Sequence, residues 1–335
     1  MARNLDGGAG RRNNRPHRDG DDGDAERPGL DGAPTPSARG AAVVSLFWLS
    51  VGFGFVTASV LAVSAVGLSL QFGITNYINF AFGDFMALGG FFAYVLNAQV
   101  FHLNIWIALV LGSVGMGALA VLINQLILAP FARRFRNTHY VLIVTFGLSL
   151  ILLNTEYSIW GAKVRFYDMP ITTALNIGPL RLTRNQLIVM GIAVALMLAM
   201  HTMLKTTRLG KSMRAMSDNT TLAMTSGIDT RRITTITWFL SGSLAGIAGT
   251  ILGISEGNLT PASGELFLFV IFAAVIVGGV GSIYGAMAGA ILIGLATEIS
   301  AAFINPAYKL DIAFVILILA LLVRPSGLFA RPGTT

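Results

Sequence analysis

The chain has no cysteine, which excludes disulfide bonds, thiolate metal sites and a cysteine nucleophile. Charge is scarce as well, because only 12% of the residues are Asp, Glu, Lys or Arg. Between residues 40 and 132 the single acidic or basic residue is Asp84, and His102 is the only histidine. Between residues 233 and 308 there are three carboxylates and no Lys or Arg. Stretches of this length with so little charge are typical of segments that lie in a lipid bilayer.

The composition is strongly apolar: hydrophobic side chains make up 54% of the chain. Apolar runs of roughly 20 residues are long enough to cross a bilayer as helices, and the short alternating segments of a β-barrel are absent. The predicted fold is therefore all-α, a polytopic transmembrane helical bundle of eight to ten membrane elements, in which some helices are allowed to be discontinuous. The predicted spans are residues 43–72, 78–98, 104–129, 139–160, 186–204, 233–254, 265–281, 284–304 and 310–323.

The first span is too long for one perpendicular helix. It is expected either to tilt or to break, near Gly52 and Gly54 or near Ser64 and Gly67.

Residues 1–40 differ from the rest of the chain. They are rich in Arg, Asp, Gly and Pro and have almost no large apolar side chains. Such a segment cannot bury a core, so we expect a disordered polar N-terminal tail. No apolar h-region follows its early arginines, so it is not a signal peptide. The predicted membrane domain covers residues 41–330, and residues 331–335 form a C-terminal tail.

The net charge of +7 lies largely in loops, and it indicates membrane topology rather than a nucleic-acid partner. Arg133, Arg134 and Arg136 predict one cytoplasmic loop, and residues 205–232 predict the next. Arg324 and Arg331 place the C-terminus on the same side. The loop 161–185 is expected on the outside, and the localisation is a cell (inner) membrane with several crossings.

The segment 205–232 is a charged island between apolar spans. Six basic residues stand against Asp218 and Asp229. Ala215, Asn219, Ala223 and Gly227 recur every four residues, which predicts one helical stripe of small side chains that another protein can approach. Gly210-Lys211-Ser212 resembles the end of a phosphate-binding loop, but Lys205 stands where the required glycine would be, so nucleotide binding by this chain is not expected.

Polar residues interrupt the apolar pattern at residues 76–85. Asn76, Asn79 and Asp84 lie between apolar runs, with Gly83 beside the acid. A backbone break at membrane depth needs polar partners for its freed N–H and C=O groups, and Asn or Asp supplies them. The segment therefore predicts either a discontinuous helix near a substrate path or an ordinary cap, in which Asp84 caps a helix that begins at Phe85.

Two glycine-rich patterns predict close helix packing: Gly278 to Gly289, with a tight turn at residues 278–282, and the face of Gly242, Gly246 and Gly249. Glu256 and Glu265 are explained by helix ends or loops, whereas Glu298 lies further inside a span and is a candidate for pore lining. The three carboxylates are scattered, with no paired His or Lys among the spans. The histidines lack metal-ligand spacing, and no cofactor is predicted.

Several motifs in order carry a resemblance to a known family. They are Gly67-Leu68-Ser69-Leu70-Gln71-Phe72-Gly73, Asn79-Phe80-Ala81 with Gly83, Thr145-Phe146-Gly147-Leu148-Ser149-Leu150, Trp160-Gly161, Thr207-Arg208-Leu209-Gly210, Gly278-Gly279-Val280-Gly281-Ser282 and Arg324-Pro325-Ser326-Gly327-Leu328-Phe329. In this order and spacing the chain resembles the permease subunits of branched-chain amino acid ABC importers, from about residue 67 to residue 329. The family usually has histidine where this chain has Phe82.

The resemblance implies a set of partners and a mechanism. The partners are a second, related permease, two cytoplasmic ATP-binding subunits and an extracytoplasmic substrate-binding protein, in membrane lipid. Residues 205–232 would be the loop that couples to an ATPase, and the mechanism would be alternating access without ATP hydrolysis by this chain. The coupling residues carried over are Arg208, Gly210, Arg214, Ala215, Asn219, Ala223 and Gly227.

A conduit for zwitterions with apolar side chains should be mostly apolar, with few polar points. The hypothesis for the substrate path takes Asn79, Asp84 and Glu298 as polar points and Phe80 and Phe82 as apolar walls. Urea, short amides, another amino acid or a sugar stay open as substrates of an importer. An ion-coupled secondary transporter would need more intramembrane ionisable groups, and a membrane enzyme would need a constellation of acids, bases or metal ligands.

Overall fold

The computed structural model describes residues 36–134, 138–170, 173–178, 180–324 and Gly327. The chain divides into two units, residues 1–42 and residues 43–335, and the description below concerns the second. Most of the predicted N-terminal tail, and all of residues 331–335, lie outside the described residues. Helix α1 (Pro36–Thr75) includes residues 36–40, the last five residues of that predicted tail.

Each predicted span contains a helix. Seven helices in the described part of the chain are long and apolar enough to cross a membrane, and α10 is a shorter apolar helix. The all-α membrane bundle is therefore confirmed. The helices in the predicted spans are α1, α2 (Phe82–Tyr94), α3 (Ile105–Ile123), α5 (Thr138–Trp160), α6 (Arg184–Thr206), α9 (Thr230–Glu256), α10 (Ala262–Gly278), α11 (Ile283–Phe303) and α12 (Lys309–Val323).

Two of these helices continue as π-helical turns. Helix α2 continues into η1 (Val95–Gln99), and α3 continues through η2 (Asn124–Leu128) into α4 (Ala129–Arg134). A single 3-10 turn, η3 (Pro306–Tyr308), precedes α12.

Helix α1 is continuous over 40 residues, so the predicted break is wrong. The residues that suggested a break serve packing or bond within the helix. A Cβ on Gly54 would lie 3.2 Å from the Leu295 Cα, and one on Gly67 would lie 3.2 Å from the Leu244 Cβ. The Ser64 hydroxyl donates to the Val60 carbonyl, which leaves the helical ladder intact. Small residues are needed here because neighbouring helices come close.

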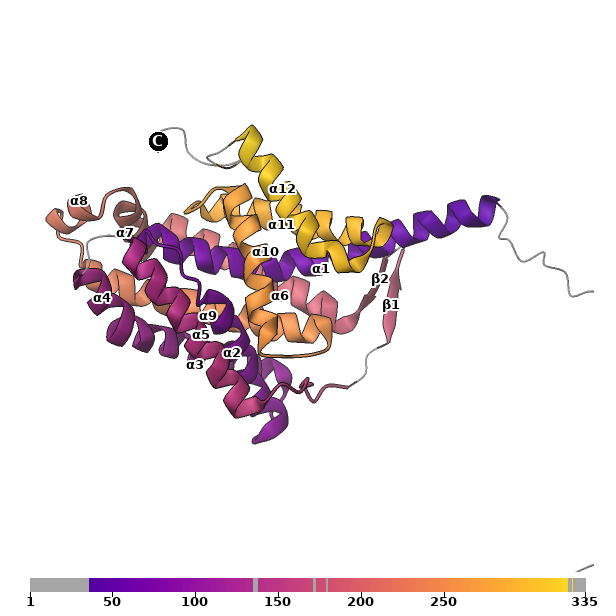
Figure 1. Cartoon of the computed structure of the whole chain (residues 1–335), viewed down its shortest axis with the longest axis horizontal. Coiled ribbons are helices and arrows are strands. Elements are labelled where there is room, and N and C mark those ends of the chain that lie inside the picture. Colours follow the sequence, from indigo (N-terminus) through magenta and orange to yellow (C-terminus); the bar gives the residue numbers. More distant parts are fainter. Residues whose placement is uncertain (1–35, 135–137, 171–172, 179, 325–326, 328–335) are drawn as a thin grey trace, which may run out of the picture. The chain divides into compact units, whose positions relative to one another are not determined.

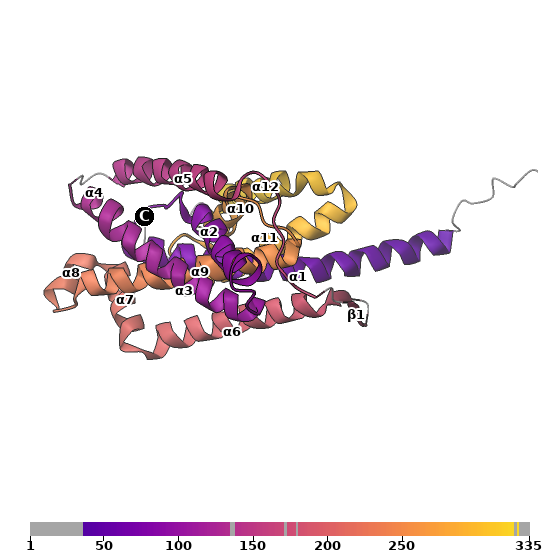
Figure 2. The same cartoon turned by 90° about the horizontal axis from the view of Figure 1, so that it is seen from below.

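Helices α2, α3 and α9 pack side by side in both views of the molecule (Figures 1 and 2). Their contacts run through glycine: a Cβ on Gly89 would overlap Gly246, and one on Gly249 would overlap the Met86 carbonyl. A Cβ on Gly242 would overlap the Ala120 side chain. The predicted packing face on Gly242, Gly246 and Gly249 is thus present, and its partners are α2 and α3.

The glycines at residues 278–289 form the predicted turn and the predicted helix contact. Gly279 and Gly281 have positive φ values of 106° and 80°, which a side chain would resist. The Ser282 hydroxyl then caps α11 by accepting from the Gly285 N–H at 3.1 Å. Gly278 and Gly285 face each other so closely that a Cβ on either would overlap the other's carbonyl.

A small antiparallel hairpin joins α5 to α6, which the sequence did not predict. Strand β1 (Ala174–Ile177) pairs with β2 (Leu180–Thr183), and Ala174 lies opposite Thr183. Thr183 then caps α6 in a capping box with Gln186. The hairpin lies at the opposite end of the structure from α7 (Arg208–Asp218) and α8 (Thr220–Thr225), as the topology prediction for loops 161–185 and 205–232 requires (Figures 1 and 2).

Candidate functional site

Residues 76–81 form the non-helical connection between α1 and α2. Asn79 is fully buried there and binds the freed backbone, because its Oδ1 accepts from the Ala81 N–H at 3.0 Å. Its Nδ2 donates to the Gln71 Oε1 on α1 at 3.4 Å. Asn76 adopts a left-handed backbone with φ of 56°. These bonds are those that a helix break inside a membrane needs.

Apolar rings surround this connection. The Phe80 ring lies edge-on to Phe146 of α5 and Phe272 of α10, with centroid distances of 6.0 and 5.3 Å. The Phe80 N–H donates to the Thr145 hydroxyl of α5 at 3.3 Å. Phe82 is fully buried and packs on Gly67 of α1. The two phenylalanines proposed as walls thus pack on different helices, Phe80 on α5 and α10 and Phe82 on α1. Thr145 is a further residue that holds this connection, and the path hypothesis did not include it.

Asp84 is not the N-cap that one interpretation of the sequence predicted. Helix α2 begins at Phe82 with Ala81 in the cap position, and Asp84 lies inside its first turn. The side chain is 1% exposed, and neither carboxylate oxygen has a hydrogen-bond partner among the described residues. Helices α5 and α10 both pack against α2. A carboxylate in the first turn interacts favourably with the helix dipole.

Two short helices begin at the same place. Helix α10 starts next to α2, because a Cβ on Gly83 would lie 2.9 Å from the Leu268 side chain and almost on the Gly264 carbonyl. Like α2, α10 follows a non-helical segment, residues 257–261, in which Gly257 has φ of 68°. Residues 257–261 are the connection expected between the predicted spans 233–254 and 265–281.

The start of α2 lies well inside the bundle. The Phe82 ring packs on Gly67, about two helical turns before the end of α1. The Phe85 ring meets Trp238, about two turns after the start of α9. Discontinuous helices whose first turns meet at membrane depth are the usual place for substrate and ion sites in transporters.

Glu298 lies apart from this segment and is paired. Its Oε1 accepts from Lys309 of α12 at 2.8 Å and from the Thr57 hydroxyl of α1 at 2.9 Å. The expectation that no Lys would pair with a span carboxylate is therefore wrong. Lys309 is the first residue of α12, so its position at a helix start hid the pair from a reading of spans.

The segment 205–232 contains two short helices instead of one. Asn219 has φ of −159° and separates α7 from α8, so the single stripe through Ala215, Asn219, Ala223 and Gly227 is wrong. The Asn219 Oδ1 caps α8 by accepting from the Leu222 N–H at 2.9 Å. Asparagine competes with the helical ladder in this way, which favours a new start over continuation.

The coupling residues carried over from the family fall into exposed and buried sets. Arg208, Arg214 and Asn219 are exposed. Gly210 is buried because a Cβ there would overlap the Leu204 backbone at the elbow between α6 and α7. Ala223 is 3% exposed and packs inward, and Gly227 has φ of 84° in the turn after α8.

Two apolar side chains on α8 face outward and were missed by the sequence analysis. Leu222 is 64% exposed and Met224 is 56% exposed. They lie outside the apolar spans, on the helix that follows α7 with its exposed Arg208 and Arg214. Exposed apolar side chains with charges around them are typical of a protein interaction surface.

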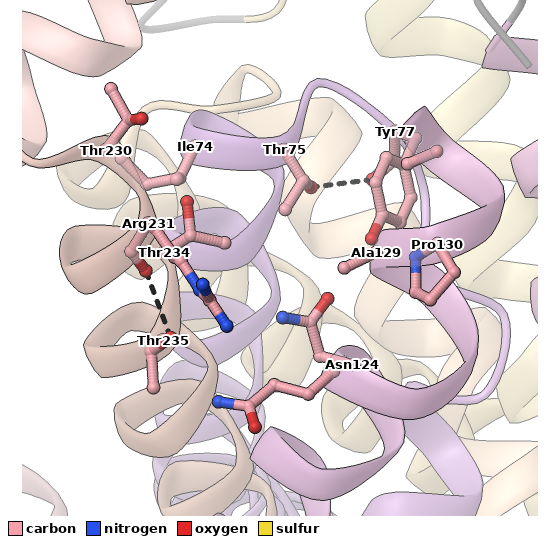
Figure 3. A pocket seen from close by; sticks show the side chains of 12 residues that line it. Ile74, Thr75, Tyr77, Asn124, Ala129, Pro130, Thr230, Arg231, Thr234 and Thr235 are labelled. Carbon is pink, nitrogen blue, oxygen red and sulfur yellow. Dashed lines mark hydrogen bonds between the residues drawn. The ribbon is translucent and has the colours of Figure 1, made fainter. Parts of the chain in front are cut away.

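A cavity of about 320 Å³ opens at the same end of the bundle, shown in Figure 3. It lies between the end of α1, the end of α3 with α4, and the start of α9. Its side chains are mostly polar, and Arg231 is the one charged residue lining it. The lining residues are Ile74, Thr75, Tyr77, Asn124, Gln125, Ala129, Pro130, Ala132, Thr230, Arg231, Thr234 and Thr235.

Comparison with known proteins gives the family. Residues 50–321 match the model of the branched-chain amino acid transport system / permease component family. The chain is 30% identical to the high-affinity branched-chain amino acid transport system permease protein LivH of Escherichia coli K12, over 86% of this chain and 97% of that protein. It is 27% identical to the permease protein BraD of Pseudomonas aeruginosa, over 83% of this chain and 94% of that protein.

A more distant relative has a different name. The chain is 25% identical to the permease protein LivM of the same Escherichia coli strain, over 78% of this chain and 66% of that protein. No solved structure matches the chain. The nine helix-containing spans, the broken helices and the match over most of the membrane domain agree, and the chain belongs to the branched-chain amino acid transport system permease component family.

Proposed function

We propose that this multi-pass membrane protein is the permease subunit of an ATP-driven importer of branched-chain amino acids. The observation that carries the proposal is the family match over residues 50–321, together with relatives named for branched-chain amino acid transport over nearly their full lengths. The apolar walls around residues 76–84 suit leucine, isoleucine or valine, whose side chains gain from contact with Phe80, Phe146 and Phe272.

The partners in this proposal are a second permease, two cytoplasmic ATP-binding subunits and an extracytoplasmic binding protein. Similarity to both LivH and LivM supports a permease pair. These two permease proteins occur in the same Escherichia coli strain, and this chain is related to each of them. The ATP-binding subunits would supply the energy, since this chain is a transport component and ATP hydrolysis is assigned to its partners.

The α7–α8 segment is the proposed contact for an ATP-binding subunit. Three residues cap three successive helices here: Thr207 caps α7, Asn219 caps α8 and Asp229 caps α9. The segment therefore holds its shape, while Leu222 and Met224 face outward. A rigid ledge can pass the closure of the ATPases to α9, which begins directly after it and packs on α2 and α3.

The proposed substrate path starts from Asn79, Phe80, Phe82 and Asp84, with Glu298 as a separate polar point. The first four share one connection and the start of α2, whereas Glu298 bonds to α1 and α12. Asn79 binds the backbone of its own connection, so its role in the path is to hold the break open. Alternating access would open this junction toward one side and then the other.

Reconstitution tests the function. The chain, a related permease and both ATP-binding subunits are placed in vesicles with the binding protein, and labelled leucine uptake is measured. Uptake should require ATP, and the isolated chain should hydrolyse none. Hydrolysis by the isolated chain, or uptake driven by a proton or sodium gradient without ATP, would overturn the proposal.

A further inference from the structure

The cavity of about 320 Å³ is not part of the path hypothesis, although it adjoins the same connection. Tyr77 belongs to residues 76–81 and lines this cavity, as do Ile74 and Thr75 at the end of α1. The cavity lies at the end of the bundle that carries α7 and α8, and the loop charges predict that this end is cytoplasmic. A substrate that has passed the break would leave by this end.

Two polar side chains that line the cavity are buried without a hydrogen-bond partner. Asn124 is 5% exposed and Tyr77 is 7% exposed, and no other described residue bonds to the Asn124 amide or to the Tyr77 hydroxyl. Figure 3 shows the side chains of Asn124 and Arg231 pointing into the same space. A buried polar group without a partner is costly, so the cavity offers bonds that a ligand can complete.

The helix that carries Asn124 departs from α-helical geometry at this residue. The π-helical turn η2 begins at Asn124, and both Asn124 and Gln125 line the cavity. Pro130 follows in α4 and has no N–H for the carbonyl of Leu126, so a regular helix cannot continue through it. π-helical turns within α-helices frequently occur at functional sites.

The lining has positive charge and no negative charge. Arg231 is exposed, is the one charged residue lining the cavity, and forms no ion pair with a described residue. A guanidinium binds a carboxylate through two parallel hydrogen bonds. The charge of the lining therefore favours a ligand with a carboxylate.

The hydroxyls in the lining provide acceptors as well. The Thr235 hydroxyl donates to the Arg231 carbonyl at 3.0 Å, and the Thr75 hydroxyl donates to the Gln71 carbonyl at 2.9 Å. Each of these oxygens has given its proton to the backbone, so it can only accept a further bond. A ligand that combines an anionic group with a donor, such as an amino acid zwitterion, matches this lining.

From these observations we propose that the cavity binds a free amino acid on the cytoplasmic side, with its carboxylate on Arg231 and Asn124. The apolar side chain of the ligand would contact Ile74, Ala129 and Pro130, which line the same cavity. The volume lies at the small end of the range for ligand pockets, which suits an amino acid better than a nucleotide. The inference rests on the proposed function, because it takes the ligand to be the imported amino acid.

The first test measures binding of labelled leucine to the full chain in lipid nanodiscs, without the binding protein. Leucine is competed with 4-methylpentanoate, which keeps the carboxylate and the branched tail, and with 3-methylbutan-1-amine, which keeps the ammonium and the tail. The acid should compete about tenfold better, because Arg231 attracts a carboxylate and repels a lone ammonium. An amine that competes as well as the acid, or inorganic phosphate that competes as well as leucine, overturns the inference.

The absence of cysteine allows the site to be located by labelling. Thr234→Cys places one thiol in the lining of the cavity, and Ser226→Cys places one on the exposed surface outside it. Leucine at about ten times its Kd should slow alkylation of the first thiol about tenfold, as mass action requires, and leave the second unchanged. Alkylation of Thr234→Cys at the same rate with and without leucine contradicts the site.

A charge variant then tests the role of Arg231. Arg231→Gln should weaken leucine binding about tenfold, because the bidentate partner of the carboxylate is lost. Arg232→Gln is the matched control, since Arg232 is the next residue of α9, is exposed and does not line this cavity. Wild-type binding by Arg231→Gln overturns the proposal.

Uptake by the reconstituted complex separates this inference from the proposed function. ATP-driven leucine uptake together with an unprotected Thr234→Cys thiol contradicts the cavity site alone. Absence of such uptake by the wild-type complex refutes the proposed function instead.

Discussion

Helix α9 and helix α12 are both apolar and both long enough to cross a membrane, yet they have opposite surroundings. The apolar stretch of α9 is 72% buried, whereas that of α12 is 6% buried. Helix α9 presents Gly242, Gly246 and Gly249 to α2 and α3, and α12 has no glycine at all. In lipid, where apolar contact alone gives little preference, the small residues decide which helices form the core.

The same comparison divides the whole bundle. Helices α2, α3 and α9 form a glycine-packed core, and α5, α6 and α12 form a periphery with 17%, 22% and 6% of their apolar stretches buried. Helix α5 is the informative exception within the periphery, because its inward side carries Glu156 against the core. The core would keep its packing during transport, and movement is expected where a peripheral helix meets it.

The largest expected effect is on stability, and it should differ between a glycine of the core and a glycine of the periphery. Gly249→Val forces side-chain atoms into the Met86 carbonyl of α2, and we expect a loss of about 3 kcal/mol of unfolding free energy. Gly147→Val on α5 is the matched control, since a Cβ there meets nothing within 4 Å. Yield and thermal unfolding of the purified chain in detergent measure both. Equal stability of the two variants would remove the distinction between core and periphery.

The next effect concerns assembly rather than folding. Replacing both Leu222 and Met224 by Asn should reduce co-purification with the ATP-binding subunits at least tenfold, because both side chains are exposed on α8. The unfolding temperature of the chain should stay the same. Leu175→Asn is the control, an exposed leucine in the hairpin at the opposite end of the molecule. A similar loss for Leu175→Asn would show a general response to lost apolar surface.

Ala223 and Gly227 make poorer probes of docking than their spacing suggested. Ala223 is buried, so a bulky residue there would disturb α8 itself. Gly227 has a positive φ of 84°, a backbone conformation that residues with a side chain rarely adopt, so its replacement would strain the turn.

A smaller effect is expected at the break between α7 and α8. Asn219→Ala removes the cap of α8 and should cost about 1 kcal/mol of local stability. Asn219→Asp keeps an accepting oxygen and should behave like the wild type. Hydrogen exchange of the α8 amides measures the opening. If Asn219→Ala instead joins residues 208–225 into one continuous helix, exchange of the α8 amides would slow. That result would mean that Asn219 alone separates α7 from α8.

The spans could be predicted from sequence because each needs a run of about 20 apolar residues, a signal that survives without any tertiary contact. The break at residues 76–81 could be predicted for a related reason: Asn76 and Asn79 are polar where lipid would exclude them. Both features are local, and each leaves its mark within a few residues.

The features that were missed depend on distant partners. Glu156 lies between polar neighbours near the end of a span, and only the packing of α5 shows that its side chain is fully buried. The close contact of Gly264 on α10 with Gly83 on α2 joins residues that are far apart in the sequence. The ion pair of Glu298 and Lys309 joins the last turns of α11 to the first residue of α12. Each of these features depends on how the helices pack, and a hydropathy pattern contains no information on that packing.

The smallest effect should come from the ion pair at the edge of the bundle. The Lys309 side chain is 43% exposed, so Lys309→Ala should cost less than about 1 kcal/mol of unfolding free energy, because water and salt screen the attraction. Glu298 keeps its bond from Thr57 in that variant, which leaves no carboxylate without a partner. Thermal unfolding at low and high salt checks the value, and the difference from the wild type should shrink at high salt. A loss of unfolding free energy as large as that of Gly249→Val would contradict the division into core and periphery. It would mean that the contact of α11 with α12 contributes to stability as much as the glycine-packed core does.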